Sequence, residues 1–248
     1  MSRGKLYIVP TPVGNLDDMS PRAIATLKDA SLILAEDTRT SAVLMRRFGI
    51  TTPMASHHKY NEHEDLSPVL DRIAAGESIA LVSDAGTPGI SDPGFMLSRE
   101  CRRRGLPVET LPGPTAFVPA LVNSGVPCDR FFFEGFLPPK KGRATRLQFL
   151  AELPVTFIIY ESPLRTAKTL SELASACGED RPAAVCREIS KIHDTTMRDT
   201  LGSLRDYYMM NQPKGEIVIV VGTSERTELS QRVHKNKYKI DEKAEKHV

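Results

Sequence analysis

Short apolar runs recur along the chain, and each is followed at once by small or polar residues. Such runs, bounded by turn residues, are typical of strands buried in a sheet. The sequence predicts strands at Leu6–Val9, Leu32–Ala35, Ile79–Val82, Val108–Leu111, Phe131–Phe136, Thr156–Tyr160, Ala183–Glu188 and Glu216–Val221.

Segments with helical signals separate these runs. Apolar residues recur three or four positions apart in several of them, which is the period of a helix with one buried face. Asp92 followed by Pro93 is a favourable helix start, since aspartate caps and proline suits the first turn. The helices are expected after Ser20, at Ser41–Phe48, around Leu66–Ile73, from Asp92 to about Arg104, and at Ala116–Asn123. The polar segment Ile189–Thr200 is expected to be a loop.

Strands and helices alternate in both halves, which indicates an α/β protein with two sheets. The Pro- and Gly-rich loop at Pro112–Thr115 is the expected boundary between them. We therefore expect an N-terminal α/β domain over residues 1–114 and a C-terminal α/β domain over residues 115–224. Residues 225–248 are highly charged and have few large apolar side chains, so a tail outside the core is expected.

Composition narrows the classes of protein. Of the 248 residues, 40% are hydrophobic and 26% are charged, which is ordinary for a globular protein, and the net charge is only +2. A nucleic-acid partner would therefore need a local basic patch. The four cysteines form no CxxC pair, so neither a zinc site nor a disulfide framework is indicated. The absence of a signal peptide and of a long apolar run favours a cytoplasmic protein without membrane association.

The segment Ile79–Gly94, IALVSDAGTPGISDPG, is the most informative part of the chain. It combines a strand, a glycine-rich loop and a helix start, and in open parallel sheets such loops lie where ligands bind. Asp84 could accept hydrogen bonds from an amine or a hydroxyl. The loop matches neither GxxxxGK[ST] nor GxGxxG, so a phosphate cradle or a dinucleotide fingerprint is not supported. Taken alone, it could also be a tight connection without a ligand.

Several motifs occur together in a characteristic order: LYIVPTPVGNLDD, AEDTRTS, LVSDAGTPGISDPG, LPGPTAF, EGFLPPKKGR, YESPLRT, CREISKIHD and KGEIVIVVG. With them the chain resembles, over about residues 5–224, the bacterial small-subunit rRNA ribose 2'-O-methyltransferases that modify a decoding-region cytidine. These enzymes belong to the tetrapyrrole-methylase superfamily. The charged tail stands where many members carry a small helical module.

The resemblance implies a two-domain class III methyltransferase fold with a mixed sheet flanked by helices in each domain. It also implies S-adenosyl-L-methionine as cofactor in the interdomain cleft, small-subunit (16S) rRNA or the 30S subunit as substrate, and a homodimer. The cofactor contacts that it implies are Pro10, Asp84, Ala85, Gly86, Thr87, Ile90, Thr115, Ala116, Tyr160, Ser162, Arg187, Glu188, Gly215, Glu216 and Ile217. Thr115, Ala116 and Ile217 could instead be packing residues.

A ribose 2'-hydroxyl is a poor nucleophile, so placement against the methyl donor should supply much of the rate and a general base would help. Asp37, His58 and Asp84 are candidate bases, and Arg39 could hold a phosphate. Asp37 and Arg39 could instead form a structural ion pair. The catalytic residues that we expect are Asp37, Arg39 and His58.

The clearest basic run follows the strand at Phe131–Phe136 and comprises Lys140, Lys141, Arg143 and Arg146. Positive charge beside a cofactor site suits an RNA substrate, although such a run could be only a solvated surface. The segment His57–Tyr60 could add a stacking contact. His57, His58 and His63 lack the spacing of a zinc set, and we expect no metal.

Two other functions fit the same motifs less well. A small-molecule methyltransferase acting on a tetrapyrrole would share the fold, but the AEDTR and SDAGTP motifs argue against it. A ribosome-binding factor that holds the cofactor without turnover would bind subunits and transfer no methyl group.

Overall fold

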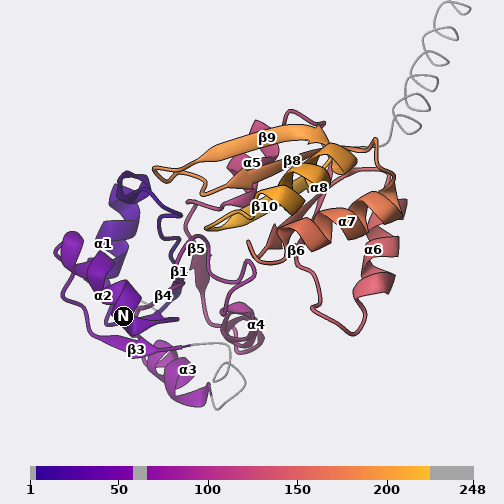
Figure 1. The fold of residues 1–248 in the computed structure, drawn as a ribbon. Helices are drawn as coiled ribbons and strands as arrows, with labels where there is room; N and C mark the ends of the chain where they lie inside the picture. Colours follow the sequence, from indigo (N-terminus) through magenta and orange to yellow (C-terminus); the bar gives the residue numbers. More distant parts are fainter. Residues whose placement is uncertain (1–3, 58–65, 224–248) are drawn as a thin grey trace, which may run out of the picture. The chain divides into compact units, whose positions relative to one another are not determined.

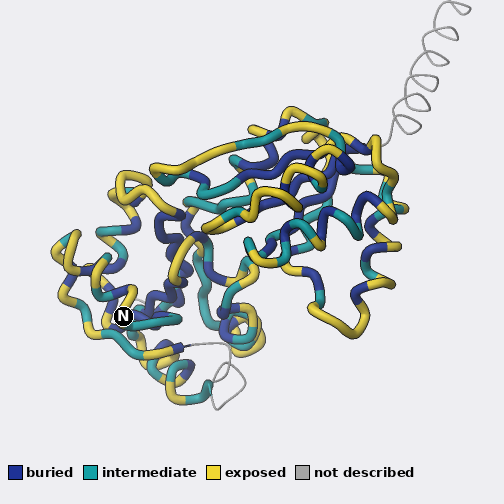
Figure 2. The backbone as a smooth tube through the Cα atoms, in the orientation of Figure 1, coloured by how far each residue is buried: buried dark blue, intermediate teal, exposed yellow. Residues whose placement is uncertain are grey.

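The computed structural model describes residues 4–57 and 66–223, and it divides the chain into two compact units, Met1–Ala116 and Phe117–Val248. Each unit has its own sheet (Figure 1). Buried backbone is concentrated in the strands and in the inner faces of the helices (Figure 2). The predicted charged tail at 225–248 and the candidate base His58 lie outside the described residues.

The first unit is built on a sheet of five strands in the order β3-β2-β4-β1-β5. All of its strand pairs are parallel. The fully apolar strands β2 and β4 lie inside the sheet, where both of their faces are buried. The strands are β1 (Leu6–Ile8), β2 (Leu32–Ala35), β3 (Met54–Ser56), β4 (Ile79–Val82) and β5 (Val108–Thr110).

Two pairs of helices cover opposite faces of this sheet. Leu27 of α1 and Met45 of α2 pack in one apolar cluster with Ala80 of β4. Leu70 of α3 and Leu97 of α4 pack in a second cluster with the alternate strand residues. Successive strand residues point to opposite faces, so the apolar runs supply both clusters. The helices are α1 (Pro21–Asp29), α2 (Thr38–Arg47), α3 (Ser67–Ala74) and α4 (Phe95–Arg103), with a short 3-10 helix, η1, at Leu16–Asp18.

This topology creates a switch point between the neighbouring strands β1 and β4. The chain leaves β1 through α1 toward β2, and it leaves β4 through α4 toward β5. These connections cross opposite faces of the sheet. In open parallel sheets, the loops diverge at such a point and leave a crevice at the carboxyl ends of the strands.

The second unit has a mixed sheet in the order β6-β7-β10-β8-β9. Only β6 and β7 pair in parallel, and the other pairs are antiparallel. The interior strand β10 is completely apolar and buried. The strands are β6 (Phe131–Phe136), β7 (Thr156–Glu161), β8 (Pro182–Arg187), β9 (Thr195–Thr200) and β10 (Ile217–Val221).

Three helices, α6 (Arg143–Glu152), α7 (Thr166–Cys177) and α8 (Leu201–Met210), cover one face of the second sheet. Leu150, Leu170 and Leu204 pack there against Phe157 and Ile219 in a single cluster. The helix α5 (Phe117–Ser124) contacts β10 and β8 on the opposite face of this sheet.

The structure confirms two α/β units, each with a sheet flanked by helices, but it differs from expectation in detail. The second sheet is mixed as expected, whereas the first is wholly parallel. The expected loop at Ile189–Thr200 ends in an edge strand, β9. The helix expected to begin at Asp92 begins at Phe95, because Ser91 and Gly94 have φ angles of 66° and 137° that turn the chain once more first.

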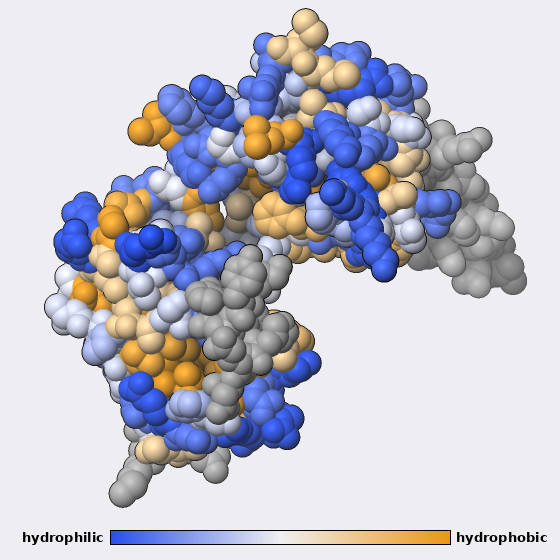
Figure 3. Space-filling view, turned by 60° about the horizontal axis from the view of Figure 1, so that its bottom comes forward, coloured by the Kyte–Doolittle hydropathy of each residue, from blue (hydrophilic) through white to orange (hydrophobic). Residues whose placement is uncertain are grey.

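The surface shown in Figure 3 is largely hydrophilic, with hydrophobic side chains in local patches. No helix within residues 4–57 and 66–223 combines the length and the apolar character needed to cross a membrane.

Candidate functional site

The loops after β1 and β4 are joined directly at the switch point. Thr11 and Gly86 exchange two backbone hydrogen bonds, from the Thr11 amide to the Gly86 carbonyl at 2.9 Å and in the reverse direction at 3.0 Å. The buried Thr11 hydroxyl also donates to the carbonyl of Ser83 at 3.1 Å. The loop that the sequence singled out is therefore held in one conformation by its neighbour.

A third loop, after β5, is attached to the same place. The hydroxyl of Thr87 donates to the carbonyl of Pro114 at 2.9 Å and lies 3.0 Å from the hydroxyl of Thr115. Ile90 continues the turn, since its amide donates to the Thr87 carbonyl. The structure thus brings together the expected cofactor residues of the first unit, Pro10, Asp84, Ala85, Gly86, Thr87, Ile90, Thr115 and Ala116, in loops that follow β1, β4 and β5.

The outermost part of the β4 loop offers polar groups to a ligand. Asp84 and Ala85 are exposed. The amides of Ala85 and Thr87 donate no hydrogen bond within the described part of the chain. Free amides and a carboxylate at one loop suit a small molecule that carries both a carboxylate and an ammonium group. The methionine part of S-adenosylmethionine has both, so these residues fit it.

Carboxylates gather beside this loop at the end of β2. The amide of Asp37 donates to the Asp84 carboxylate at 3.2 Å. Asp37 caps α2 and forms a two-pronged ion pair with Arg39, in which one nitrogen–oxygen distance is 2.8 Å. The hydrogen bonds from Arg39 lower the pKa of Asp37 to about 2, so this carboxylate is a weak base. The side chain of Arg39 is 90% exposed.

Asp92 is the residue of this region that sequence reasoning assigned only to a helix cap. Its burial, together with the negative charges of Glu36 and Asp84, raises its pKa to about 7. Desolvation, with the charge of Asp37 added, also raises the pKa of Asp84. A carboxylate with a pKa near neutrality is suited to accept a proton at physiological pH. The position of Asp92 in the SDPG segment, just past the glycine-rich loop, was the signal available in the sequence.

The expected cofactor residues of the second unit also lie together, at one end of the neighbouring strands β7, β10 and β8 or just beyond it. The pairing of the strands places Glu161, Ile217 and Arg187 side by side across β7, β10 and β8. Beyond this row, the amide of Glu188 donates to the carbonyl of Glu216 at 2.9 Å, and the Glu188 carboxylate accepts from the Glu216 amide at 2.8 Å. The set comprises Tyr160, Ser162, Arg187, Glu188, Gly215, Glu216 and Ile217.

Two of these residues have defined local roles. The Tyr160 hydroxyl accepts a hydrogen bond from the amide of Phe117 at 3.2 Å, and its ring packs edge-on against Phe133 and Phe136. Ser162 donates its amide to the Glu161 carboxylate at 2.7 Å, which holds the turn after β7. Tyr160 therefore lies in an aromatic cluster that a flat ligand ring could join.

The basic run divides into two pairs. Lys140 and Lys141 are exposed at the loop before α6. Arg143 is buried, and its guanidinium bonds to Glu172 and to the Thr169 hydroxyl, each at 2.7 Å. Arg146 makes an ion pair with Glu134 at 2.5 Å and lies over the ring of Phe149. The two lysines are thus available to a polyanion, whereas the two arginines are held by the fold.

The described residues contain no group of three or more histidine, cysteine, aspartate or glutamate side chains arranged to hold a metal ion. Of the three histidines noted in the sequence, His57 is buried directly after β3, and His58 and His63 lie outside the described residues.

Comparisons with known proteins identify relatives along nearly the whole chain. Residues 5–205 match the family model of the Tetrapyrrole (Corrin/Porphyrin) Methylases. The chain is 46% identical over 224 residues to the ribosomal RNA small subunit methyltransferase I of Pseudomonas aeruginosa, covering 89% of this chain and 79% of that protein. It is 47% identical over 219 residues to the protein of the same name from Synechocystis sp., covering 88% of this chain and 78% of the relative.

Solved structures share the fold at lower identity. A cobalt precorrin-4 methyltransferase matches with a TM-score of 0.64 and 22% identity over 88% of this chain and 94% of its own. The uroporphyrin-III C-methyltransferase from Thermus thermophilus, solved with S-adenosyl homocysteine, matches with a TM-score of 0.59 and 19% identity over 88% of this chain and 97% of its own.

Proposed function

Because this chain belongs to the ribosomal RNA small subunit methyltransferase I family, within the tetrapyrrole methylases, we propose that it methylates the ribose 2'-hydroxyl of a cytidine in the decoding region of 16S rRNA. The carrying observation is the match to these relatives along nearly the whole described chain. The first sheet gathers at its switch point the loops of the motifs LYIVPTPVGNLDD and LVSDAGTPGISDPG, on which the sequence resemblance rests.

The cofactor of this reaction is S-adenosyl-L-methionine, which supplies an electrophilic methyl group on a sulfonium. Asp84 and the amides of Ala85 and Thr87 suit its methionine part. We assign the adenosine part of the cofactor to Thr115, which is held by Thr87, and to Ala116. In the second unit, we assign Ile217 and its strand neighbours to the same part.

The residues near the β4 loop divide the remaining tasks. Asp37 holds Arg39 by its ion pair, and the exposed guanidinium of Arg39 contacts a phosphate of the RNA. Since the pKa of Asp37 is about 2, we assign it to orienting Arg39 and not to taking the proton. Asp92, with its pKa near 7, is the described carboxylate best suited to accept the proton of the 2'-hydroxyl, and His58 remains a second candidate.

The substrate is the small-subunit rRNA, free or in the 30S subunit, and the enzyme acts in the cytoplasm as a homodimer. Lys140 and Lys141 supply charge for the RNA. Of the other two residues that the sequence placed in this set, Arg143 connects α6 to α7 and Arg146 connects α6 to β6, next to the loop that carries the two lysines.

The test is mass mapping of rRNA after incubation of the protein and labelled S-adenosylmethionine with 30S subunits that lack the modification. We expect one added methyl group on the ribose of a decoding-region cytidine. Labelled porphyrinoid with unlabelled rRNA would replace this proposal by tetrapyrrole methylation. Tight binding to subunits without transfer at saturating cofactor would replace it by a binding factor.

A charge-reversal variant examines the RNA contact separately. Lys140→Glu with Lys141→Glu should weaken RNA binding about tenfold, since each lysine that contacts a phosphate contributes counterion release. Cofactor affinity, measured by calorimetry, should stay at its wild-type value. Loss of cofactor binding in this variant would contradict the assignment of the loop.

A further inference from the structure

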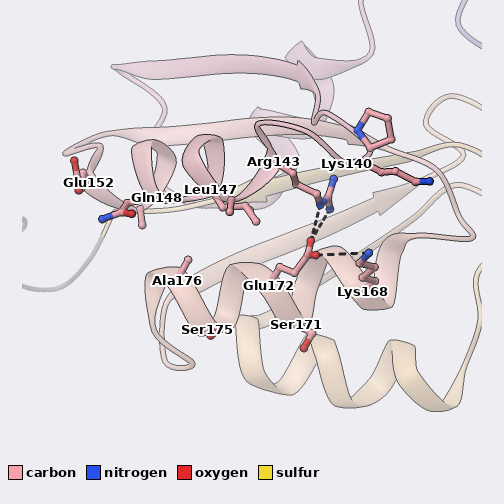
Figure 4. A pocket seen from close by; sticks show the side chains of 13 residues that line it. Lys140, Arg143, Leu147, Gln148, Glu152, Lys168, Ser171, Glu172, Ser175 and Ala176 are labelled. Carbon is pink, nitrogen blue, oxygen red and sulfur yellow. Dashed lines mark hydrogen bonds and ion pairs between the residues drawn. The ribbon is translucent and has the colours of Figure 1, made fainter.

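A groove runs between the helices α6 and α7 of the second unit. Its volume is about 990 Å³, and Figure 4 shows the side chains that line it. Short side chains on both helices, Ala144, Ala151, Ser175 and Ala176 among them, leave this space open. All of its lining residues come from the second unit, from the loop before α6 and from the two helices.

One end of this groove carries lysines on both of its sides. Lys140 lies in the loop before α6, and Lys168 lies across the groove on α7 (Figure 4). Lys168 is 66% exposed, and its ammonium is 3.8 Å from the carboxylate of Glu172, too far for a hydrogen bond. The ammonium of Lys140 has no ion pair among residues 4–57 and 66–223.

The acidic residue beside these lysines is already compensated. Glu172 accepts a hydrogen bond from the buried guanidinium of Arg143 at 2.7 Å. The other acidic lining residue, Glu152, lies at the opposite end of the groove (Figure 4). Positive charge is thus concentrated at the end formed by Lys140 and Lys168, and Ser171 of α7 is also among the lining residues.

We propose that this groove binds the sugar–phosphate backbone of the substrate rRNA, with Lys140 and Lys168 contacting phosphates from opposite walls. The inference rests on the proposed function and extends the contact assigned to Lys140 across the groove to α7. Ammonium groups contact phosphates whatever the base sequence, and serine and glutamine side chains are common partners of phosphate and sugar oxygens. Ser171, Ser175 and Gln148 supply such groups along the groove.

The experiment measures the dissociation constant for deproteinised small-subunit rRNA, and the KM for unmethylated 30S subunits, as functions of salt concentration. Lys168→Gln removes one charge without creating repulsion toward Glu172, and Lys140→Gln with Lys168→Gln removes both. Lys28→Gln, on the exposed surface of α1 in the first unit, is the matched control.

We expect the double variant to bind RNA about tenfold more weakly, and its salt slope to fall by about one for each lysine removed. Affinity for S-adenosylmethionine should equal that of the wild type, which verifies folding. In wild-type protein, Lys140 and Lys168 should be protected from acylation by bound RNA, whereas Lys28 should not.

The groove assignment would be overturned if the double variant had the RNA affinity and salt slope of Lys28→Gln, or if bound RNA did not protect Lys168 from acylation. Methyl transfer by the wild type would still support the proposed function in that case. Normal binding of free rRNA with impaired binding of 30S subunits would assign the groove to a ribosomal protein and overturn the proposal. A wild type that methylates neither substrate contradicts the proposed function itself.

Discussion

The amide of Asp37 donates a hydrogen bond to the carboxylate of Asp84, 3.2 Å away, although 47 positions separate the two residues in the chain. The bond connects the end of β2 to the end of β4, which are neighbouring strands. It orients the Asp84 side chain at the loop that we assign to the cofactor, so that its position is set before any ligand arrives.

The Asp84→Ala variant should bind S-adenosylmethionine at least about tenfold more weakly, because it loses a charged hydrogen-bond acceptor, and such bonds are worth about 1.5–3 kcal/mol. Asp84→Asn keeps an acceptor for the Asp37 amide and is the matched control, with an intermediate loss expected. Isothermal titration calorimetry measures both. Unchanged affinity in Asp84→Ala would remove this loop from the cofactor site.

The stability of the protein should depend on pH through Asp92. Its pKa is raised from 3.8 to about 7 on folding, so the folded chain binds this proton more tightly. The resulting stabilisation is complete below about pH 4 and is lost as the pH rises from there through about 7. At pH 8 the ionised group therefore destabilises the fold, and Asp92→Asn should be more stable than the wild type by on the order of 1–3 kcal/mol.

Urea unfolding at pH 4 and pH 8 measures this difference, which should nearly vanish at the lower pH. The exposed Asp180→Asn serves as control and should show no comparable gain. A stability difference that is the same at both pH values would mean that Asp92 acts through packing and not through its charge.

Gly215 is expected to resist substitution for two reasons. Its φ is +88°, and a Cβ atom there would overlap the side chain of Glu188. Gly178 has a φ of +98° but open space around its missing Cβ, so Gly178→Ala measures the backbone cost alone. Gly178 has a ψ of 142°, which places it in a region that glycine alone adopts readily, and a residue held there costs about 1–3 kcal/mol.

Gly215→Ala should therefore lose more stability than Gly178→Ala, since Glu188 must also release the Glu216 amide and the Lys191 ammonium. Thermal unfolding compares the two variants. Equal losses would show that the Glu188 side chain can move aside without cost. Its hydrogen bonds would then not stabilise the segment that leads into β10.

Arg143 should be important for stability. Its side chain is 7% exposed, and it lies among Glu172, Thr169 and the 1% exposed Glu161. Removing the guanidinium takes the 2.7 Å donor from Glu172, while Glu161 keeps the Arg165 guanidinium and the Ser162 amide. The loss of such a charged hydrogen bond costs about 1.5–3 kcal/mol. Arg143→Met should unfold at correspondingly lower denaturant concentration.

The control is Arg103→Met, in which a 72% exposed arginine loses its ion pair with Glu100. Exposed pairs contribute about 0–1 kcal/mol, so little change is expected. If the two variants unfold alike, the Arg143 network would be no more than a surface pair, and the two arginines of the basic run would return to the RNA-binding set.

The sequence predicted the parts of the fold that follow from local pattern. The buried strands β2, β4 and β10 are continuous apolar runs, and their positions were predicted correctly. The strand β9, TTMRDT, was missed because it is a polar edge strand with several exposed residues. The start of α4 was predicted too early, since the positive φ angle at Ser91 leaves no clear signal in residue type.

The candidate site was predictable to the same extent. The loops after β1, β4 and β5 could be named because glycine, proline and small polar residues mark them. The raised pKa of Asp92 could not be foreseen, because it depends on Glu36, which strand pairing brings near from 56 positions away. The burial of Arg143 depends likewise on Glu172, which α7 supplies from 29 positions further on.

The mutual hydrogen bonds of Thr11 and Gly86 have a consequence for affinity. Fixing the backbone of a residue costs about 1–2 kcal/mol of conformational entropy, and a loose loop would incur that cost each time a ligand bound. Here the fold itself has already immobilised the loops that follow β1 and β4. A small molecule that enters at the switch point can therefore keep most of the free energy of its contacts as binding strength.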